Sequence, residues 1–285
     1  MKKIISALFV SLVLIACQKD ASDANGTQTP AKTILNASYG ADTAQRMDVY
    51  LPATRNTTDT KILIMVHGGA WTTGDKADFN EYIPVFKQRL PDYALFNINY
   101  RLAQLPSTNL FPTQEADVKA AFAFILARAQ EYGFNKDKLV VFGASAGAHL
   151  ALLQVYKNAD TKVNAVIDLF GPTDMAALYN SFTDPFEKFA LQSIVGGTPA
   201  TAAAIYQASS PLNFVSAQSP PTLIFHGGDD PLVPMQQSVS LKTKLAQANV
   251  PVQLVTYPGE GHGWVGPNLT DTYNKIESFL KTYNP

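Results

Sequence analysis

The chain has 285 residues, of which 46% are hydrophobic and 16% charged, and its formal net charge at pH 7 is −1. This composition is typical of a globular protein rather than a disordered one, and it leaves no excess of Lys and Arg for binding nucleic acid. A single cysteine excludes a disulfide framework and a cysteine-based zinc cluster, and the four histidines lack the HExxH spacing, so we expect no metal and no cofactor.

The first 17 residues have the pattern of an export signal. Positive charge at residues 1–3 precedes an apolar run at 4–16, which is shorter than the ~20 residues of a membrane-spanning helix. The run ends directly before Cys17, which resembles a bacterial lipoprotein signal, where the chain is cut before a cysteine that then carries lipid. The resemblance implies anchoring in the bacterial cell envelope, in the periplasm or on the outer surface. An ordinary signal peptide with an incidental cysteine is the alternative.

The rest of the chain is expected to form a polar tether at 18–33 and one domain at 34–285. Continuous apolar runs, which are typical of strands buried on both faces, occur at 61–66, 93–98, 138–142, 163–170, 222–225 and 252–257. Apolar residues at helical spacing occur at 114–131, at 146–156 and from Leu269 to Leu280. This alternation predicts an α/β protein with a mostly parallel sheet and helices on both faces.

An insertion at 171–219 interrupts the alternation. Asp184 followed by Pro185 has the pattern of a helix start, and Thr198 before a proline predicts a second short helix. We expect these helices to form a cap over the carboxyl edge of the sheet, where ligands bind in open α/β folds.

The sequence GASAG at 143–147 lies between a predicted strand and a predicted helix. A GxSxG motif in this context forms a sharp turn that exposes the serine hydroxyl. Free N–H groups at the start of the helix favour the negative charge that develops there. Ser145 is therefore the predicted nucleophile, and a turn serine without chemistry is the alternative.

A serine hydroxyl needs a base to become a strong nucleophile. His262 lies in a glycine-rich loop between the last strand and the last helix, at the same sheet edge as Ser145. His149 is one turn into the helix after Ser145 and His226 ends a strand, so both are expected to pack in the core. His67 belongs to another loop. His262 is the predicted base.

The base needs a carboxylate that fixes its tautomer and stabilises the imidazolium. Asp229 and Asp230 both follow the strand at 222–225. We favour Asp230, directly before Pro231. The alternative is that Asp230 only caps the turn, a role that Asp229 could serve as well, so the choice between the two stays open. The chain order Ser, Asp, His is that of α/β-hydrolases.

The sequence HGGAW at 67–71 follows the strand at 61–66 directly. Small residues let backbone N–H groups turn into the site, where they could hold an oxyanion; a plain glycine turn is the alternative. Trp71 and Trp264 flank this loop and His262. They form either an aromatic wall for a sugar or phenolic group or ordinary hydrophobic packing.

From about Arg46 to the C-terminus, the chain resembles α/β-hydrolase esterases of the group near hormone-sensitive lipases and bacterial acetylxylan and feruloyl (BD-FAE-like) esterases. The matching stretches are HGGAW at 67–71, NYRL at 99–102, FPTQEADVKAA at 111–121, FGASAGAHLALL at 142–153, SPL at 210–212, FHGGDDPLVP at 225–234 and GEGHGW at 259–264.

The resemblance implies a site built from the side chains of Ser145, Asp230 and His262 and the oxyanion-binding N–H groups of Gly69, Ala70 and Ala146. The lipase-like pattern HGGG has a third glycine where this chain has Ala70. Because only the backbone N–H is needed, this difference concerns the shape of the acyl pocket. The NYRL stretch and Asp117 are interpreted as structural, with Arg101 paired to a carboxylate.

The expected function is a serine carboxylic-ester hydrolase that works through an acyl-enzyme. Its substrate would be a small-molecule or saccharide-linked ester, with acetyl or feruloyl esters of polysaccharides as the specific hypothesis. No nucleic acid is expected as a partner, and a membrane only through the lipid anchor. An amidase or formamidase with the same triad is one alternative, and a non-catalytic surface-anchored binding protein on a hydrolase fold is another.

Overall fold

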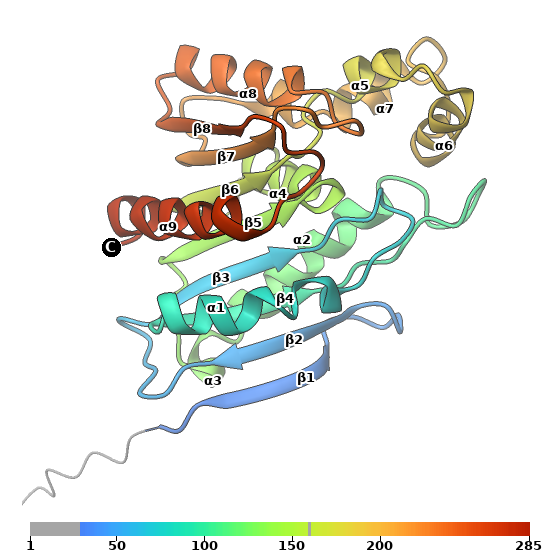
Figure 1. The fold of residues 1–285 in the computed structure, drawn as a ribbon. Helices are drawn as coiled ribbons and strands as arrows, with labels where there is room; N and C mark the ends of the chain where they lie inside the picture. Colours follow the sequence, from blue (N-terminus) through green and yellow to red (C-terminus); the bar gives the residue numbers. More distant parts are fainter. Residues whose placement is uncertain (1–28, 159–160) are drawn as a thin grey trace, which may run out of the picture.

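A mixed sheet forms the centre of the molecule (Figure 1). The computed structural model describes residues 29–158 and 161–285, in which the strand order is β1-β2-β4-β3-β5-β6-β7-β8. The parallel part consists of β4 (Tyr93–Ile98), β3 (Lys61–Val66), β5 (Leu139–Ala144), β6 (Ala165–Leu169), β7 (Thr222–Gly227) and β8 (Val252–Tyr257). The prediction of an α/β fold with a mostly parallel sheet is confirmed. Cys17 and the export signal lie outside the described residues.

Two antiparallel strands at one edge of the sheet are not apparent from the sequence. β1 (Lys32–Ser38) pairs with β2 (Arg46–Leu51), which pairs with β4. β1 is mostly exposed and contains a bulge, so it shows neither an apolar run nor a clean alternation. The predicted tether boundary is wrong by two residues, because Lys32 and Thr33 already belong to β1.

Helices cover both faces of the sheet (Figure 1). α1 (Tyr82–Arg89) and α9 (Gly266–Tyr283) pack on one face, and α2 (Thr113–Leu126), α4 (Ala146–Tyr156) and α8 (Gln236–Gln247) pack on the other. Burial on both faces explains why β3 and β4 are continuous apolar runs.

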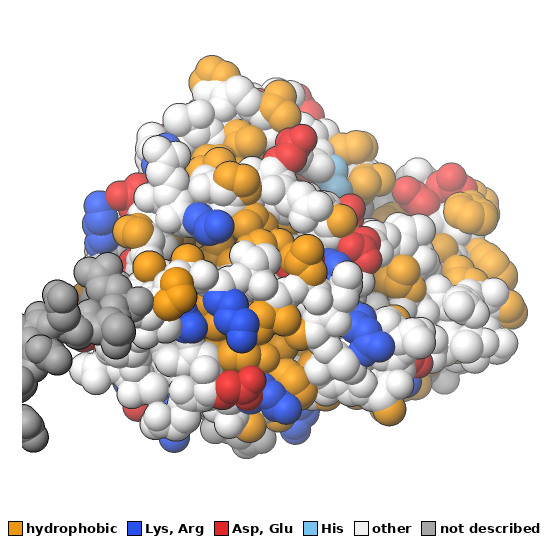
Figure 2. Space-filling view, turned by 90° about the horizontal axis from the view of Figure 1, so that it is seen from below, with side chains coloured by type: hydrophobic (Ala, Val, Ile, Leu, Met, Phe, Trp, Pro, Cys, Tyr) orange, Lys and Arg blue, Asp and Glu red, His pale blue; other side chains and the backbone are white. Residues whose placement is uncertain are grey.

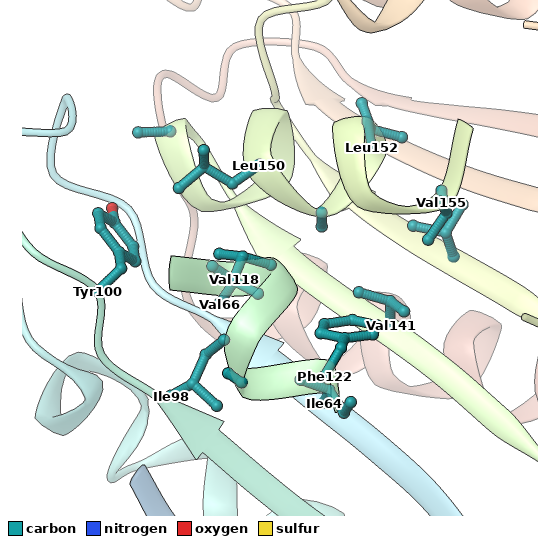
Figure 3. Packing of buried hydrophobic residues seen from close by; sticks show 14 of the residues in the cluster. Ile64, Val66, Ile98, Tyr100, Val118, Phe122, Val141, Leu150, Leu152 and Val155 are labelled. Carbon is teal, nitrogen blue, oxygen red and sulfur yellow. The ribbon is translucent and has the colours of Figure 1, made fainter. Parts of the chain in front are cut away.

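The core between α4 and the sheet gives the candidate nucleophile a rigid base. In Figure 3, Leu150 and Val155 of α4 and Phe122 of α2 lie over Val66 of β3 and Val141 of β5. All of these side chains are almost completely buried. Because α4 begins directly after Ser145, this packing fixes the turn that carries the serine.

The predicted helix at 114–131 is two helices. α2 ends at Leu126, and a turn separates it from α3 (Ala129–Tyr132). The apolar spacing continues through the turn because Ala129 packs against the same core.

One 3-10 helix, η1 (Lys76–Phe79), precedes α1.

The insertion forms a cap beyond the carboxyl ends of the strands (Figure 1). It consists of α5 (Met175–Ser181), α6 (Pro185–Val195), α7 (Ala203–Ala208) and the 3-10 helix η2 (Pro211–Phe214). Asp184 caps α6 as predicted, accepting the N–H of Phe186 at 2.8 Å. The helix predicted at Thr198 is wrong, since Thr198 and Thr201 bond to each other in a turn and the next helix begins at Ala203. Local bonds of this kind compete with helix formation.

Charged side chains of both signs are interspersed on the face in Figure 2, among scattered hydrophobic ones. No helix in the described ranges combines the length and the apolar character that crossing a membrane requires.

Candidate active site

Ser145 occupies a strained turn between β5 and α4. Its backbone has φ 54° and ψ −123°, a conformation that costs energy for a residue with a side chain. The flanking glycines allow this turn to approach its neighbours closely. A Cβ at Gly147 would lie 2.1 Å from the carbonyl oxygen of Val66, and one at Gly143 would lie 2.6 Å from the Cα of Ala148.

His262 reaches Ser145 from the loop between β8 and α9. Its Nε2 lies 2.8 Å from Oγ of Ser145, and its Nδ1 lies 2.7 Å from Oδ2 of Asp230. A carboxylate can only accept, so Nδ1 carries the proton and Nε2 is free to accept the serine proton. The ring of Phe170 packs against His262 with a centroid distance of 4.4 Å and limits its rotation.

Asp230 is held on both oxygens. While Oδ2 faces His262, Oδ1 accepts the backbone N–H groups of Leu232 and Val233 at 2.9 and 3.0 Å. Burial favours the neutral carboxyl, but the bonds from His262 and the two backbone groups outweigh it and lower the pKa of Asp230. Asp229 is exposed, and its backbone N–H bonds to the carbonyl of Glu260. Of the two candidates, the structure therefore brings Asp230 to His262.

The loop at 67–71 turns its backbone toward Ser145. Gly69, Ala70 and Trp71 all have positive φ, at 105°, 47° and 62°, and the carbonyl of Gly69 is turned away to accept the N–H groups of Thr72 and Thr73. Within 29–158 and 161–285, no hydrogen bond uses the backbone N–H of Gly69 or Ala70.

Ala146 is the third residue whose backbone N–H was expected to bind an oxyanion. It is the first residue of α4, and its N–H has no partner within the described ranges. Three N–H groups beside one serine hydroxyl are suited to stabilising a negative oxygen.

Two other histidines are held in the interior. His149 accepts the indole N–H of Trp71 at 3.1 Å and donates to the carbonyl of Ser209 at 2.7 Å. Burial lowers the pKa of His149 to about 4, so it stays neutral. His67 stacks on Tyr100 at a centroid distance of 4.4 Å. Neither ring makes a hydrogen bond to the hydroxyl of Ser145.

The two tryptophans differ in position. Trp71 lies in the wall of the cavity above Ser145, although only 6% of it is exposed. Trp264 does not line this cavity, and the interpretation of this residue as a substrate wall is wrong. It packs against Phe170 and Tyr257 and donates its indole N–H to Thr272 at 2.8 Å, because the chain turns it toward the core after His262.

A cavity of about 530 Å³ opens above Ser145 and His262. The cap and neighbouring loops supply its apolar wall, which includes Leu105, Leu178, Phe182, Phe186, Leu191, Ile194 and Leu232. Glu187 of α6 also lines the cavity. Sequence reasoning missed all of these residues, and also Phe170, because they come from separate segments without a shared motif.

The carboxylate that pairs with Arg101 is that of Asp117. The guanidinium contacts both carboxylate oxygens at 2.6–3.2 Å, and Gln45 donates to the same carboxylate at 2.7 Å. This network ties the segment after β4 to α2.

Comparisons with known proteins agree with this geometry. Residues 47–245 match the BD-FAE family. The chain belongs to this family. Esterase LipC of Mycobacterium tuberculosis is 29% identical to the BD-FAE chain over 262 residues, which cover 85% of the chain and 63% of LipC. The probable carboxylic ester hydrolase LipM of the same organism is 31% identical over 242 residues, covering 80% of the chain and 55% of LipM.

The BD-FAE chain thus spans less than two thirds of the length of either relative. Among solved structures, a truncated carbohydrate esterase from gut microbiota superposes with a TM-score of 0.76 at 26% identity, covering 90% of this chain and 97% of that one. The fold is that of the α/β-hydrolase esterases.

Proposed function

We propose that this protein is a serine carboxylic-ester hydrolase in which Ser145, His262 and Asp230 form a catalytic triad. The observation that carries the proposal is the unbroken line of hydrogen bonds from Asp230 through His262 to Ser145, with lengths of 2.7 and 2.8 Å. This line ends in the cavity, where an ester could reach the hydroxyl. The esterase relatives support the same chemistry.

The reaction proceeds in two acyl transfers. Ser145 attacks the ester carbonyl while its proton passes to Nε2 of His262, which then protonates the leaving alcohol. Asp230 stabilises the imidazolium formed in this step. Water, activated by His262, then attacks the acyl-enzyme and releases the acid.

The oxyanion of each tetrahedral intermediate is held by backbone N–H groups. Gly69 and Ala70 supply two donors from the loop after β3, and Ala146 supplies a third from the start of α4. Donors fixed in place before the reaction cost no reorganisation, and losing one such donor typically costs ~10²–10³ in rate. The third glycine of the HGGG pattern is not needed for this role, because Ala70 adopts positive φ.

The proposed substrates are acetyl or feruloyl esters of polysaccharides. The carbohydrate esterase with the same fold supports a saccharide-linked ester. A cavity of about 530 Å³ with an apolar wall lies within the usual size range of small-molecule sites and supports an acyl group larger than acetyl. Within this proposal the structure therefore favours feruloyl over acetyl.

A fluorophosphonate probe tests the chemistry. We expect wild-type protein to be labelled and the Ser145→Ala variant to stay unlabelled with an unchanged circular dichroism spectrum. An unlabelled wild-type protein would refute the triad and favour a binding protein on a hydrolase fold. Rates on methyl ferulate, acetylated xylan and matched aryl esters and amides then define the substrate, and faster amide cleavage would favour an amidase.

The envelope anchor is a separate part of the proposal. It rests on the apolar run at 4–16 and on Cys17, the only cysteine in the chain. Expression of the full chain with radiolabelled palmitate should label the wild-type protein and not the Cys17→Ser variant. A labelled Cys17→Ser variant, or an unlabelled wild-type protein, would exclude lipidation at this position.

A further inference from the structure

A second imidazole faces the carboxylate of Asp230. His226 is the penultimate residue of β7, and its side chain is fully buried. Its Nε2 lies 2.8 Å from the carbonyl oxygen of Val233 and 3.4 Å from Oδ2 of Asp230. The two-step reaction described above assigns this side chain no part.

The hydrogen bonds of His226 define its tautomer. The carbonyl of Val233 can only accept, so Nε2 carries the proton. Nδ1 must then accept, and its partner is the hydroxyl of Ser238 on α8 at 2.7 Å. Burial lowers the pKa of His226, although the Val233 carbonyl and Asp230 oppose this effect, and both neighbours fit a neutral ring.

The same ring is linked to both oxygens of Asp230. Its Nε2–H donates to the carbonyl of Val233, a residue whose own N–H binds Oδ1 at 3.0 Å, and Nε2 itself lies 3.4 Å from Oδ2. We propose that His226, held by Ser238 in its Nε2–H form, is a positioning residue that keeps Asp230 in line with His262. The proposal rests on the triad proposed above.

The expected role is strongest during the reaction. When His262 becomes an imidazolium, catalysis requires Asp230 to stay in one orientation, and a misplacement of ~1 Å can cost ~10²-fold in rate. The titratable groups that face His226 are Asp230 and His262, while Asp229 of the same loop is exposed. Because the His226 ring is neutral, it holds the Val233 segment beside Asp230 without adding a second cation that would compete with His262 for the carboxylate.

Steady-state kinetics of three variants test this role, with kcat expressed per active site titrated by a fluorophosphonate. His226→Ala should lower kcat by about 10- to 100-fold and leave KM of a p-nitrophenyl ester unchanged, because His226 does not line the cavity. His226→Gln should restore most of the rate, since its amide can donate from a similar position. The matched control is Tyr156→Phe, which removes a buried bond of 2.7 Å to Thr222 of the same strand without touching Asp230. It should keep the wild-type kcat.

The proposal is overturned if His226→Ala keeps wild-type kcat per titrated site, or if His226→Gln is no faster than His226→Ala. If His226→Ala does not fold, Ser238→Ala decides. That variant should lower kcat, and it should move the low-field proton NMR signal of the His262 Nδ1–H upfield. If kcat or the position of this signal stays at its wild-type value, the proposal is overturned. Failure of the wild-type protein to react with the fluorophosphonate would instead refute the triad itself.

Discussion

The buried carboxyl of Asp168 gives the protein a pH-dependent stability that one substitution can remove. Asp168 lies in β6 and is fully buried. Its Oδ1 accepts the N–H of Gly171 at 2.8 Å, and within the described residues Oδ2 has no hydrogen-bond partner. Burial raises the pKa of Asp168 to about 7, although the bond from Gly171 opposes this effect. The Asp168→Asn variant keeps the acceptor for Gly171 and removes the ionisation.

The size of the effect follows from proton linkage. In the unfolded chain this carboxyl ionises near its ordinary pKa of 3.8, whereas the folded protein keeps the proton up to about pH 7. Between these values the folded state binds one more proton, so the free energy of unfolding falls as pH rises. Each pH unit corresponds to ~1.4 kcal/mol. From pH 5 to pH 8 the wild-type protein therefore loses roughly 3 kcal/mol of stability through this residue.

Urea unfolding at pH 5, 6, 7 and 8, followed by the fluorescence of the two buried tryptophans, measures this loss. The free energy of unfolding of Asp168→Asn, relative to wild type, should increase by roughly 3 kcal/mol between pH 5 and pH 8. The amide N–H groups that replace Oδ2 add a cost that is the same at every pH. The control is Asp184→Asn at the exposed start of α6, where Asn also caps a helix. A constant difference between Asp168→Asn and wild type over this range would refute the reasoning.

Three further predictions test the site. Asp230→Asn should lower kcat by ~10⁴, because Nδ1–H of His262 loses its ionised acceptor, whereas the exposed Asp229→Asn should leave kcat unchanged; equal losses would contradict the geometry. Gly147→Ala places a Cβ 2.1 Å from a backbone oxygen of β3, so both the melting temperature and fluorophosphonate labelling should fall, and a wild-type labelling rate would argue against the tight turn. Phe182→Ala removes a side chain from the apolar wall and enlarges the cavity. The highest kcat/KM should therefore move to p-nitrophenyl esters with longer acyl chains, and an unchanged dependence on chain length would exclude this wall as the acyl site.

The sharp turn at Ser145 was predictable because its motif reflects close packing. Gly143 and Gly147 are required where the turn approaches Ala148 and the end of β3, so their spacing around Ser145 directly reflects tertiary contact. The strand before this turn, β5, was predicted from its continuous apolar run, and the helix after it, α4, from apolar residues at helical spacing. Local geometry of this kind can be predicted from the sequence, because it requires particular residues at fixed spacing.

The direction of a side chain within a loop cannot be predicted in this way. Asp229 and Asp230 differ by one position, and only the folded loop shows that the N–H groups of Leu232 and Val233 meet Asp230. Trp264 is two residues from His262, but its ring packs against Phe170 and Tyr257 and does not line the cavity. Nearness in sequence to His262 therefore did not predict which side chains reach the cavity.

The elements that sequence reasoning missed are those held by long-range contact. β1 is mostly exposed, and within it only Ile34 and Ala37 pack against the core, so it shows no regular apolar pattern, and its place is set by backbone pairing with β2. The cavity wall gathers side chains from the cap, the segment after β4 and the loop after β7. Residues such as Leu105 and Leu232 are ordinary surface leucines until the fold brings them together.

The proposed reacting groups and the side chains of the cavity wall lie in different parts of the fold. Hydrogen bonds of 2.7 and 2.8 Å hold His262 between Asp230 and Ser145 at the carboxyl edge of the sheet, so under the proposed mechanism substitutions there should alter the rate of the chemical step. Phe186 on α6 is 73% exposed, and the carboxylate of Glu187 has no ion-pair partner within the described part of the chain. Substitutions at exposed positions of this kind cost little stability. On the proposed function, single substitutions in the cap should therefore change the substrate preference while the hydrogen bonds from Asp230 through His262 to Ser145 stay intact.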